Sequence, residues 1–534
     1  MQLSRFLFAL LSVTAMAFGA ESTNSNKRIV SLEECVQMAL QHNFDVQIQR
    51  LSPDIARYNL SVSFGGYDPT LSFSGEHDYS LSPGGLDQQG RQFSGTESES
   101  DRFSTGIGGL LPWGMTYNVG GSLADRFSTS PGTIPDFSSP ILITNSFVDI
   151  NSGNTISFVS TNYNTIPARF PFENTSGNVG FLQLRQPVLK NFWIDSTRLN
   201  IAIRKRDLKI SELDLRFQIM STVTAVAQAY YNLIFARENV KVQEKALELA
   251  ERLLAENKKR VEVGAMAPLD EKQAESQAAT SRADLLAAQN TMATQENTLK
   301  DLLTDDYKTV HATEMIPAEL LTAMPESFNL QQSWEKGLSQ RPDFLQARLN
   351  LEKQGYIVRF QKNQLFPQLD LFGTYGFSAS GQEYTDALDQ FRRGNSPFYS
   401  AGAQISIPLG NSAARNSYKA AKATKEQTEL LVKQLEQRVM VQIDNSVKQA
   451  QSSFERVEAT RQARIYAEAA LDAEQKKLEN GKSTSFQVLQ FQRDLTAARS
   501  AEIRALADYN IALALLAQAE GATLERHHLS LDMK

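Results

Sequence analysis

The feature that most constrains this chain is a run of helix-compatible sequence much longer than a globular domain uses. Residues 196–260 contain neither proline nor glycine over 65 positions, and a continuous helix of that length would reach about 100 Å at ~1.5 Å per residue. A second such run covers residues 413–480, and shorter helical segments follow the two runs at 270–304 and 484–520. Helices of this length are typical of coiled coils, so the sequence predicts two long helical hairpins.

A single glycine separates the long and the short helical segment in each half. Gly264 and Gly481 are 217 positions apart, and glycine tolerates the left-handed backbone that ends many helices. Pro187 and Pro408 end strand-like segments ahead of the long helices and are 221 positions apart. Because two different features recur in the same order at nearly the same spacing, the chain consists of two similar halves.

Strand-like segments with alternating apolar and polar residues accompany both pairs of helices. The second half has them at residues 366–380 and 398–409, and the first half opens with one after Pro69. Such alternation fits a wall with one face toward lipid and the other toward water, and it also fits a soluble sandwich. About four strands in one chain are too few to close a membrane barrel, so a barrel would require several copies of the chain.

The first half also contains an insertion. Pro69 and Pro367 open the first strand of each half and are 298 positions apart, so about 77 additional residues lie within residues 82–177. Alternation over residues 103–123, on both sides of a Leu-Pro-Trp-Gly sequence at 111–114, predicts an extra hairpin there.

The N-terminus indicates export. Arg5 precedes an apolar run at residues 6–18 that is too short to span a bilayer as a helix, and small residues follow it, so residues 1–20 are predicted to be a signal peptide. No later stretch approaches ~20 continuous apolar residues. The single cysteine, Cys35, lies past any cleavage site and is expected to be a buried small apolar residue.

Composition and motifs argue against nucleic-acid binding and against an enzyme. The formal charge of −6 gives no basic character. The five histidines show no metal-ligand spacing, and no glycine-rich Lys-Ser/Thr loop for phosphate is present. We therefore predict no catalytic residue, no cofactor and no metal site.

Taken in this order, the features resemble the TolC family of outer-membrane channels. The resemblance covers about Ser31 to Gly521 and is carried by an entry helix at residues 31–43, the strand-opening prolines, the Ile405–Leu409 strand end and both glycine breaks. It implies a mixed α/β membrane protein in which three protomers each donate about four strands to a shared transmembrane barrel. The helices would continue that barrel as a coiled-coil tunnel in the periplasm of a Gram-negative-type cell.

The resemblance also implies partners and an organisation. The homotrimer would contact outer-membrane lipid and dock by its helical tips onto a periplasmic adaptor and, through it, an inner-membrane pump. Extra membrane strands would disturb the match to a tunnel of helices, so we favour an extracellular extension for the insertion. The expected segments are a signal peptide (1–20), a first repeat (31–304) with the insertion (82–177), a linker (305–329), a second repeat (330–521) and a C-terminal tail (522–534).

Residue roles follow from placing the two glycine breaks on the tips of the family. The expected adaptor-contact residues are Gly264, Ala265, Met266, Gly481, Lys482 and Ser483. The expected pore-entrance residues are Asp270, which matches the family's aspartate, with Leu478, Gln487 and Gln490. Both glutamines occupy positions where well-known members carry an acidic pair, and Leu478 and Ser483 occupy those of a tyrosine and an arginine. We therefore expect no acidic ring and a closed state held by other contacts.

One alternative stays open on sequence grounds. A periplasmic coiled-coil scaffold without a pore would need the long helices, but it would not need amphipathic strands that end in aromatic clusters such as Phe192-Trp193 and Phe398-Tyr399. The sequence does not identify the substrate, and it does not separate small-molecule efflux from type I secretion.

Overall fold

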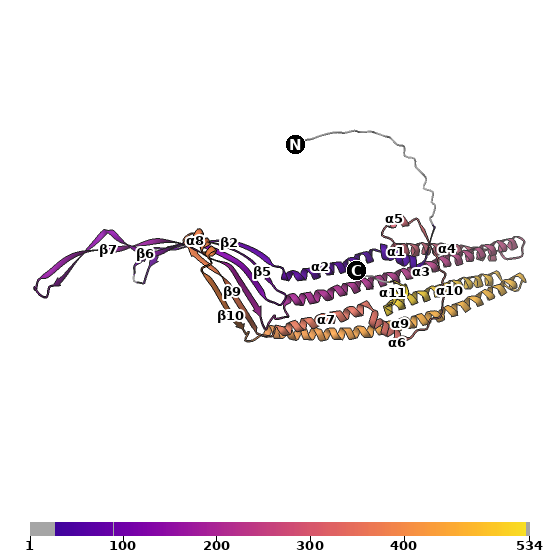
Figure 1. The fold of residues 1–534 in the computed structure, drawn as a ribbon. Coiled ribbons are helices and arrows are strands. Elements are labelled where there is room, and N and C mark those ends of the chain that lie inside the picture. Colours follow the sequence, from indigo (N-terminus) through magenta and orange to yellow (C-terminus); the bar gives the residue numbers. More distant parts are fainter. Residues whose placement is uncertain (1–26, 89, 530–534) are drawn as a thin grey trace, which may run out of the picture. The chain divides into compact units, whose positions relative to one another are not determined.

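The computed structural model describes residues 27–88 and 90–529 (Figure 1). The predicted signal peptide lies outside the described residues. Within these limits the chain divides into two compact units, one made of residues up to 53, 211–346 and from 433 onward, the other of residues 54–210 and 347–432. The first contains the helical hairpin tips, and the second contains the large sheet.

Long helices occupy both proline-free and glycine-free runs. They and their shorter partners are α3 (Ser196–Glu262), α4 (Pro268–Leu303), α9 (Ser412–Glu479) and α10 (Ser485–Glu520). α3 and α9 have 67 and 68 residues, and α4 and α10 have 36 residues each. Because both hairpins agree to within one residue, the duplication extends to the lengths of the elements.

Shorter helices precede the strands and close the ends of the hairpins. They are α1 (Leu32–His42), α2 (Phe44–Phe64), η1 (Gly65–Tyr67), α5 (Tyr307–Val310), α6 (Leu330–Gln340), α7 (Pro342–Asn363), α8 (Tyr384–Arg393) and α11 (Thr523–Arg526). Side-chain caps start the entry helix of each half, because Ser31 accepts a hydrogen bond from Glu34 N and Asn329 accepts from Gln331 N. α8 was not predicted; its C-cap Gly394, at φ +62°, is the signal that marks its end.

The core of the first unit surrounds a small parallel pair, β1 (Lys27–Val30) with β8 (Glu314–Pro317). Tyr230 of α3 and Cys35 of α1 are both completely buried in this core. Burial raises the pKa of the Cys35 thiol to about 12, so the thiol stays protonated at neutral pH. The expectation of a buried, apolar cysteine is confirmed.

The second unit contains one antiparallel sheet of six strands in the order β10-β9-β7-β6-β5-β2. Their bounds are β2 (Thr70–Ser82), β5 (Thr96–Leu110), β6 (Thr116–Val148), β7 (Thr155–Pro187), β9 (Gln368–Gly381) and β10 (Pro397–Ser406). A minor pair, β3 (Gly85–Leu86) and β4 (Gln92–Phe93), lies in the β2–β5 connection.

The strand count corrects the expectation of about four strands per protomer. The insertion supplies β5 and most of β6, and both lie inside the sheet between β2 and β7. Backbone amides and carbonyls must find partners, and these two strands find them on both sides. Residues 96–128 of the insertion thus belong to the sheet, while the extracellular position expected for the insertion stays a prediction. Beyond the end of β5, residues Thr129 to Val148 of β6 pair only with β7.

Candidate functional site

The first helical hairpin ends in a glycine turn (Figure 1). Gly264 has a φ of +74°, and its amide donates to Val261 O at 2.9 Å, while Ala265 N donates to Arg260 O at 2.7 Å. These two bonds form a Schellman C-cap, in which the left-handed residue is glycine because a side chain would be strained there. Pro268 then opens α4 at a position that needs no amide donor.

The second hairpin ends in the same way. Gly481 has a φ of +70°, its amide donates to Leu478 O at 3.0 Å, and Lys482 N donates to Lys477 O at 2.8 Å. Thr484 caps α10 by accepting a hydrogen bond from Gln487 N at 3.3 Å. Among the expected adaptor-contact residues, Gly264, Ala265, Gly481 and Lys482 are exposed, and Met266 and Ser483 are half-buried.

A buried polar contact joins the two tips. Asn257 of α3 and Ser485, the first residue of α10, are each 1% exposed. Ser485 Oγ donates to Asn257 Oδ1 at 3.1 Å, and Asn257 Nδ2 donates to the backbone oxygen of Asp270 at 3.4 Å. The side chain of Asn257 thus connects three segments near the turns, and removing the Ser485 hydroxyl leaves a buried acceptor without its donor.

Similar contacts repeat along α3 and α10, farther from the tips. Asn239 Oδ1 accepts from Ser500 Oγ at 2.8 Å, and Asn232 Oδ1 accepts from Arg504 Nη1 at 3.2 Å. Sequence reasoning missed this asparagine ladder, which we define as Asn232, Asn239 and Asn257. The sequence does contain a signal for these contacts, because asparagine is unfavourable inside a helix unless its side chain has a hydrogen-bond partner.

Hydrophobic packing near the tips also links the hairpins. A buried cluster comprises Leu253, Leu471, Val488, Leu489 and Leu495, from α3, α9 and α10. Leu478, expected at the pore entrance, packs against this cluster. A leucine at this position therefore contributes apolar contact and no hydrogen bond, unlike the tyrosine that the resemblance places there.

The second tip holds a carboxylate in a closed hydrogen-bond network. Ser483 Oγ donates to Glu474 at 2.5 Å, and Lys477 Nζ donates to Glu474 Oε2 at 2.9 Å. The Ser483 hydroxyl, followed by the Lys477 ammonium, lowers the pKa of Glu474 below its ordinary value.

This network predicts acid sensitivity of the second tip. The folded-state pKa of Glu474 lies below the unfolded value, so its contribution to stability is present above that unfolded value and is lost as pH falls through the folded pKa. Ser483→Ala should therefore reduce the acid-dependent part of thermal stability below about pH 5. Melting temperatures of both proteins over pH 3–7 measure this, and identical pH profiles would contradict it.

The remaining expected pore-entrance residues lie on the first turn of α4 and the first two turns of α10. Gln487 is exposed; Gln490 is also exposed, donates to Asp494 Oδ1 at 3.2 Å and accepts from Arg493 Nη2 at 2.8 Å. Asp270 is half-buried on the first turn of α4. These positions present two uncharged amides where the family pattern carries carboxylates.

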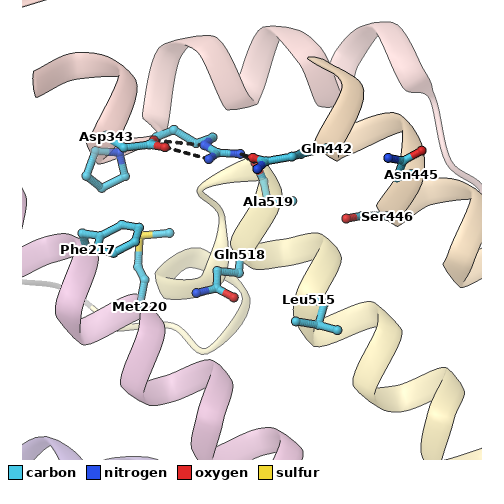
Figure 2. A pocket seen from close by; sticks show the side chains of 11 residues that line it. Phe217, Met220, Asp343, Gln442, Asn445, Ser446, Leu515, Gln518 and Ala519 are labelled. Atoms are coloured by element: carbon cyan, nitrogen blue, oxygen red, sulfur yellow. Dashed lines mark hydrogen bonds and ion pairs between the residues drawn. The ribbon is translucent and has the colours of Figure 1, made fainter. Parts of the chain in front are cut away.

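A separate polar junction lies where α6 and α7 meet α9 and α10, beside a cavity of about 440 Å³ (Figure 2). The guanidinium of Arg341 donates to both carboxylate oxygens of Asp343, at 3.0 and 2.7 Å, to Gln442 Oε1 at 3.0 Å and to Ala519 O at 3.3 Å. Phe217 and Met220 contribute an apolar part of the cavity lining. Arg341 also lines the cavity, but its N–H groups are already engaged in these hydrogen bonds. We assign Arg341 the role of fixing the α6–α7 bend.

The second unit offers a sheet with two different faces. Large apolar residues on one face of β2, β9 and β10 are exposed, among them Leu71, Phe73, Leu371, Tyr375, Tyr399 and Ile405. The alternate positions carry serine, threonine, glutamine and charged residues, including the Arg185–Asp370 ion pair at 2.5 Å. Among the described residues, no helix is both long enough and apolar enough to cross a membrane.

Comparison with known proteins agrees with these observations. The profile of the family "Outer membrane efflux protein" matches residues 159–304 and 335–522. The outer membrane efflux protein BepC of Brucella suis is 25% identical over 368 residues, which is 68% of this chain and 76% of BepC. The outer membrane protein TolC of Vibrio cholerae is 25% identical over 320 residues, or 57% of this chain and 68% of TolC.

Solved structures share the fold at low identity. A membrane protein from Pseudomonas aeruginosa gives a TM-score of 0.64 at 17% identity and covers 96% of this chain and 97% of its own. The CmeC outer membrane channel of Campylobacter jejuni gives 0.62 at 15% identity and covers 98% of both chains. Matched hairpins, an amphipathic sheet and a family profile over both repeats lead to one assignment: the chain belongs to the outer membrane efflux protein family and is a TolC-type efflux channel protein of the outer membrane.

Proposed function

We propose that three copies of this chain form a tip-gated channel that serves as the outer-membrane component of a tripartite efflux pump or a type I secretion system. Small molecules or proteins would pass from a periplasmic adaptor and an inner-membrane pump to the exterior. The energy would come from the pump, and this subunit would perform no catalysis.

One observation carries the proposal: a single chain combines an exposed amphipathic sheet that has two unpaired edge strands with two helical hairpins that end in matched glycine turns. An apolar sheet face is stable in lipid only when its edges are paired, which copies of the same chain accomplish by closing a shared barrel. The glycine turns then form the surface of Gly264, Ala265, Met266, Gly481, Lys482 and Ser483 that contacts the adaptor.

The proposal is tested by single-channel recording of the detergent-purified protein in planar bilayers, with its mass in detergent measured alongside. A trimer with discrete, mostly small conductance steps is expected. A monomer without conductance would remove the pore and favour the coiled-coil scaffold, which needs the hairpins and has no use for an apolar exposed sheet.

The two tip glutamines predict weak ion selectivity. Gln487 and Gln490 place no charge at the pore entrance, so we expect slight cation preference and weak block by divalent cations. The double variant Gln487→Asp/Gln490→Asp would add six carboxylates per trimer and should lower the blocking concentration of a divalent cation by about tenfold or more. Gln449→Asp/Gln451→Asp, at two exposed positions of α9 away from the tip, is the charge-matched control. Strong divalent block of the unmodified channel would contradict the assignment of these positions.

The Asn257–Ser485 contact is proposed to hold the tips together in the closed state. Ser485→Ala removes the hydroxyl donor at a buried site, at a cost of about 1–3 kcal/mol, and should raise the open probability. Ser500→Ala removes the same type of hydrogen bond between the same two helices, at Asn239, and should leave the open probability unchanged. The measurement is open probability in bilayers at fixed voltage. Equal behaviour of the two variants would show that the contact has no gating role.

A further inference from the structure

We infer that the inserted hairpin β5–β6 crosses the membrane, so that the closed barrel contains eighteen strands, six from each protomer, instead of twelve. This inference rests on the proposed trimer, and it changes the size and the lining of the pore. Three features of the sheet support it: the register of its strands, the chemistry of its two faces and the position of the β5–β6 turn.

The inserted strands are complete members of the sheet. β5 pairs with β2 from Thr70 through Ser82 without a register shift, and β6 pairs with β5 from Ser98 through Leu110. β6 also pairs with β7 from Thr116 onward. If the insertion were an external cap, β2 would instead pair with β7 directly, and the described register leaves no such pairing.

Two neighbouring cross-strand rows show that the inserted strands share the faces of the others. One row runs through all six strands and is entirely apolar or aromatic: Leu71, Ile107, Val119, Leu182, Tyr375 and Tyr399. The next row contains only polar residues and glycine: Thr70, Gly108, Asn118, Gln183, Thr374 and Ser400. Ile107 and Val119 are 47% and 44% exposed, close to the 50% of Tyr375 in β9. A strand that faces solvent on both sides has no need for this alternation.

The apolar band on the inserted strands has a defined upper limit. On the same face, above Phe103 and Leu123, Asp101 and Asp125 lie opposite each other. His77 Nδ1 lies 2.7 Å from Asp101, and Thr175 Oγ1 donates to Asp125 at 2.8 Å. The row of β2, β5, β6 and β7 is thus polar at this level, which suits the outer membrane–water boundary.

The lower limit is the β5–β6 turn at residues 111–114. Gly114, at φ +89°, packs so closely on Asn191 that an added Cβ would lie 3.2 Å from its backbone oxygen. The turn therefore lies against Asn191, which directly precedes the Phe192–Trp193 pair in the sequence, and Trp113 and Trp193 are both exposed. Tryptophan is enriched at membrane interfaces. From Trp113 to Asp101, about 12 residues at ~3.3 Å and a ~45° tilt span roughly 28 Å, close to the ~25 Å apolar band of such barrels.

The number of strands in the closed barrel follows from the two edge strands of the sheet. β2 and β10 each have one neighbour in the sheet, so they are the strands that meet the adjoining protomers. Three protomers of six strands close at eighteen, and because barrel diameter grows roughly in proportion to strand number, the bore widens by about half relative to twelve strands. The water-facing side gains Arg102, which pairs with Glu76 at 3.5 Å and Asp78 at 3.3 Å.

Spin-label accessibility tests this in the full-length protein reconstituted in phospholipid vesicles. Single cysteines are introduced into a Cys35→Ala background at Ile107 and Val119, which should face lipid, and at Ser104 and Ser122, which should face the pore. Tyr375 and Thr374 of β9 are the matched reference pair. We expect Ile107→Cys and Val119→Cys labels to be accessible to oxygen and protected from a water-soluble nickel chelate as strongly as Tyr375→Cys, with the opposite pattern at Ser104, Ser122 and Thr374.

The outcomes separate the two ideas. Water accessibility on both faces of β5 and β6, with Tyr375 still in lipid, would overturn the six-strand inference and leave the channel intact. Water accessibility at Tyr375 as well would mean that the sheet does not enter the bilayer, and the proposed function itself would fail. Counting strands in an electron cryomicroscopy map of the unmodified trimer needs no variant: eighteen supports the inference, and twelve overturns it.

Discussion

Replacing Lys300 by methionine is expected to lower the free energy of unfolding by about 3–5 kcal/mol. The Lys300 side chain is 4% exposed, and its Nζ donates to Glu296 Oε1 at 2.9 Å and to His311 O at 3.0 Å. Glu296 Oε1 also accepts from Met315 N at 3.0 Å in β8. Methionine fills similar volume but leaves the buried Glu296 carboxylate without its cation, and the penalty of an unpaired buried charge dominates.

Urea denaturation followed by far-ultraviolet circular dichroism measures the change. Lys241→Met removes a lysine that is 65% exposed and pairs with Glu238, so it should change stability by less than about 0.5 kcal/mol. The double variant Lys300→Met/Glu296→Gln should recover part of the loss, because a neutral amide is cheaper to bury than a charge. A Lys300→Met protein as stable as Lys241→Met would show that the pair is not buried in the assembled channel.

Tyr230→Ala is expected to destabilise the first unit by about 3–5 kcal/mol through the cavity it creates. Tyr230 is completely buried, its hydroxyl donates to Val30 O at 3.1 Å and accepts from Ala318 N at 3.2 Å. It therefore ties α3 to β1 and to the residue that follows β8. Tyr230→Phe keeps the ring and should cost only about 1 kcal/mol, because Val30 O and Ala318 N keep a direct hydrogen bond to each other at 2.9 Å.

The matched control is Tyr509→Phe. Tyr509 is 1% exposed, but its hydroxyl makes a single hydrogen bond, to Met324 O at 2.6 Å. Its loss should cost about 1 kcal/mol. Denaturation midpoints of the three variants rank the effects: Tyr230→Phe and Tyr509→Phe should lie close together, and a Tyr230→Ala cost no larger than theirs would contradict the cavity argument.

The helices and their breaks could be predicted because their signals are local. Absence of proline and glycine over residues 196–260, followed by Gly264, determines where α3 continues and where its cap lies. The same pattern recurs before Gly481, so the second hairpin could be predicted in the same way. The strands of the second half were found because Leu371 and Tyr375 alternate with polar neighbours on both sides.

The position of β5 and β6 within the sheet could not be predicted, because alternation does not reveal which strand is the neighbour. Ile107 and Val119 alternate in the same way whether they join the sheet or form a separate hairpin, and only the pairing with Leu71 and Leu182 decides.

The Asn257–Ser485 contact was missed for a similar reason. Its partners are 228 positions apart, and although asparagine is unfavourable inside a helix, nothing in the sequence identifies Ser485 as the partner of Asn257. Long-range side-chain pairing depends on how α3 and α10 pack, which periodicity alone does not determine. The exposed positions of the turns, by contrast, follow directly from the glycines.

The position of β5 and β6 between β2 and β7 has a consequence for how such sheets change during evolution. A hairpin returns the chain to the end of the sheet from which it left, so β2 still begins after α2 and β7 still ends before α3. A single added strand would reverse β7 and deliver α3 to the opposite end. When strands are added two at a time, every later strand and helix keeps its direction. A duplicated or acquired hairpin can therefore enlarge the sheet without any change in the order or direction of the helices.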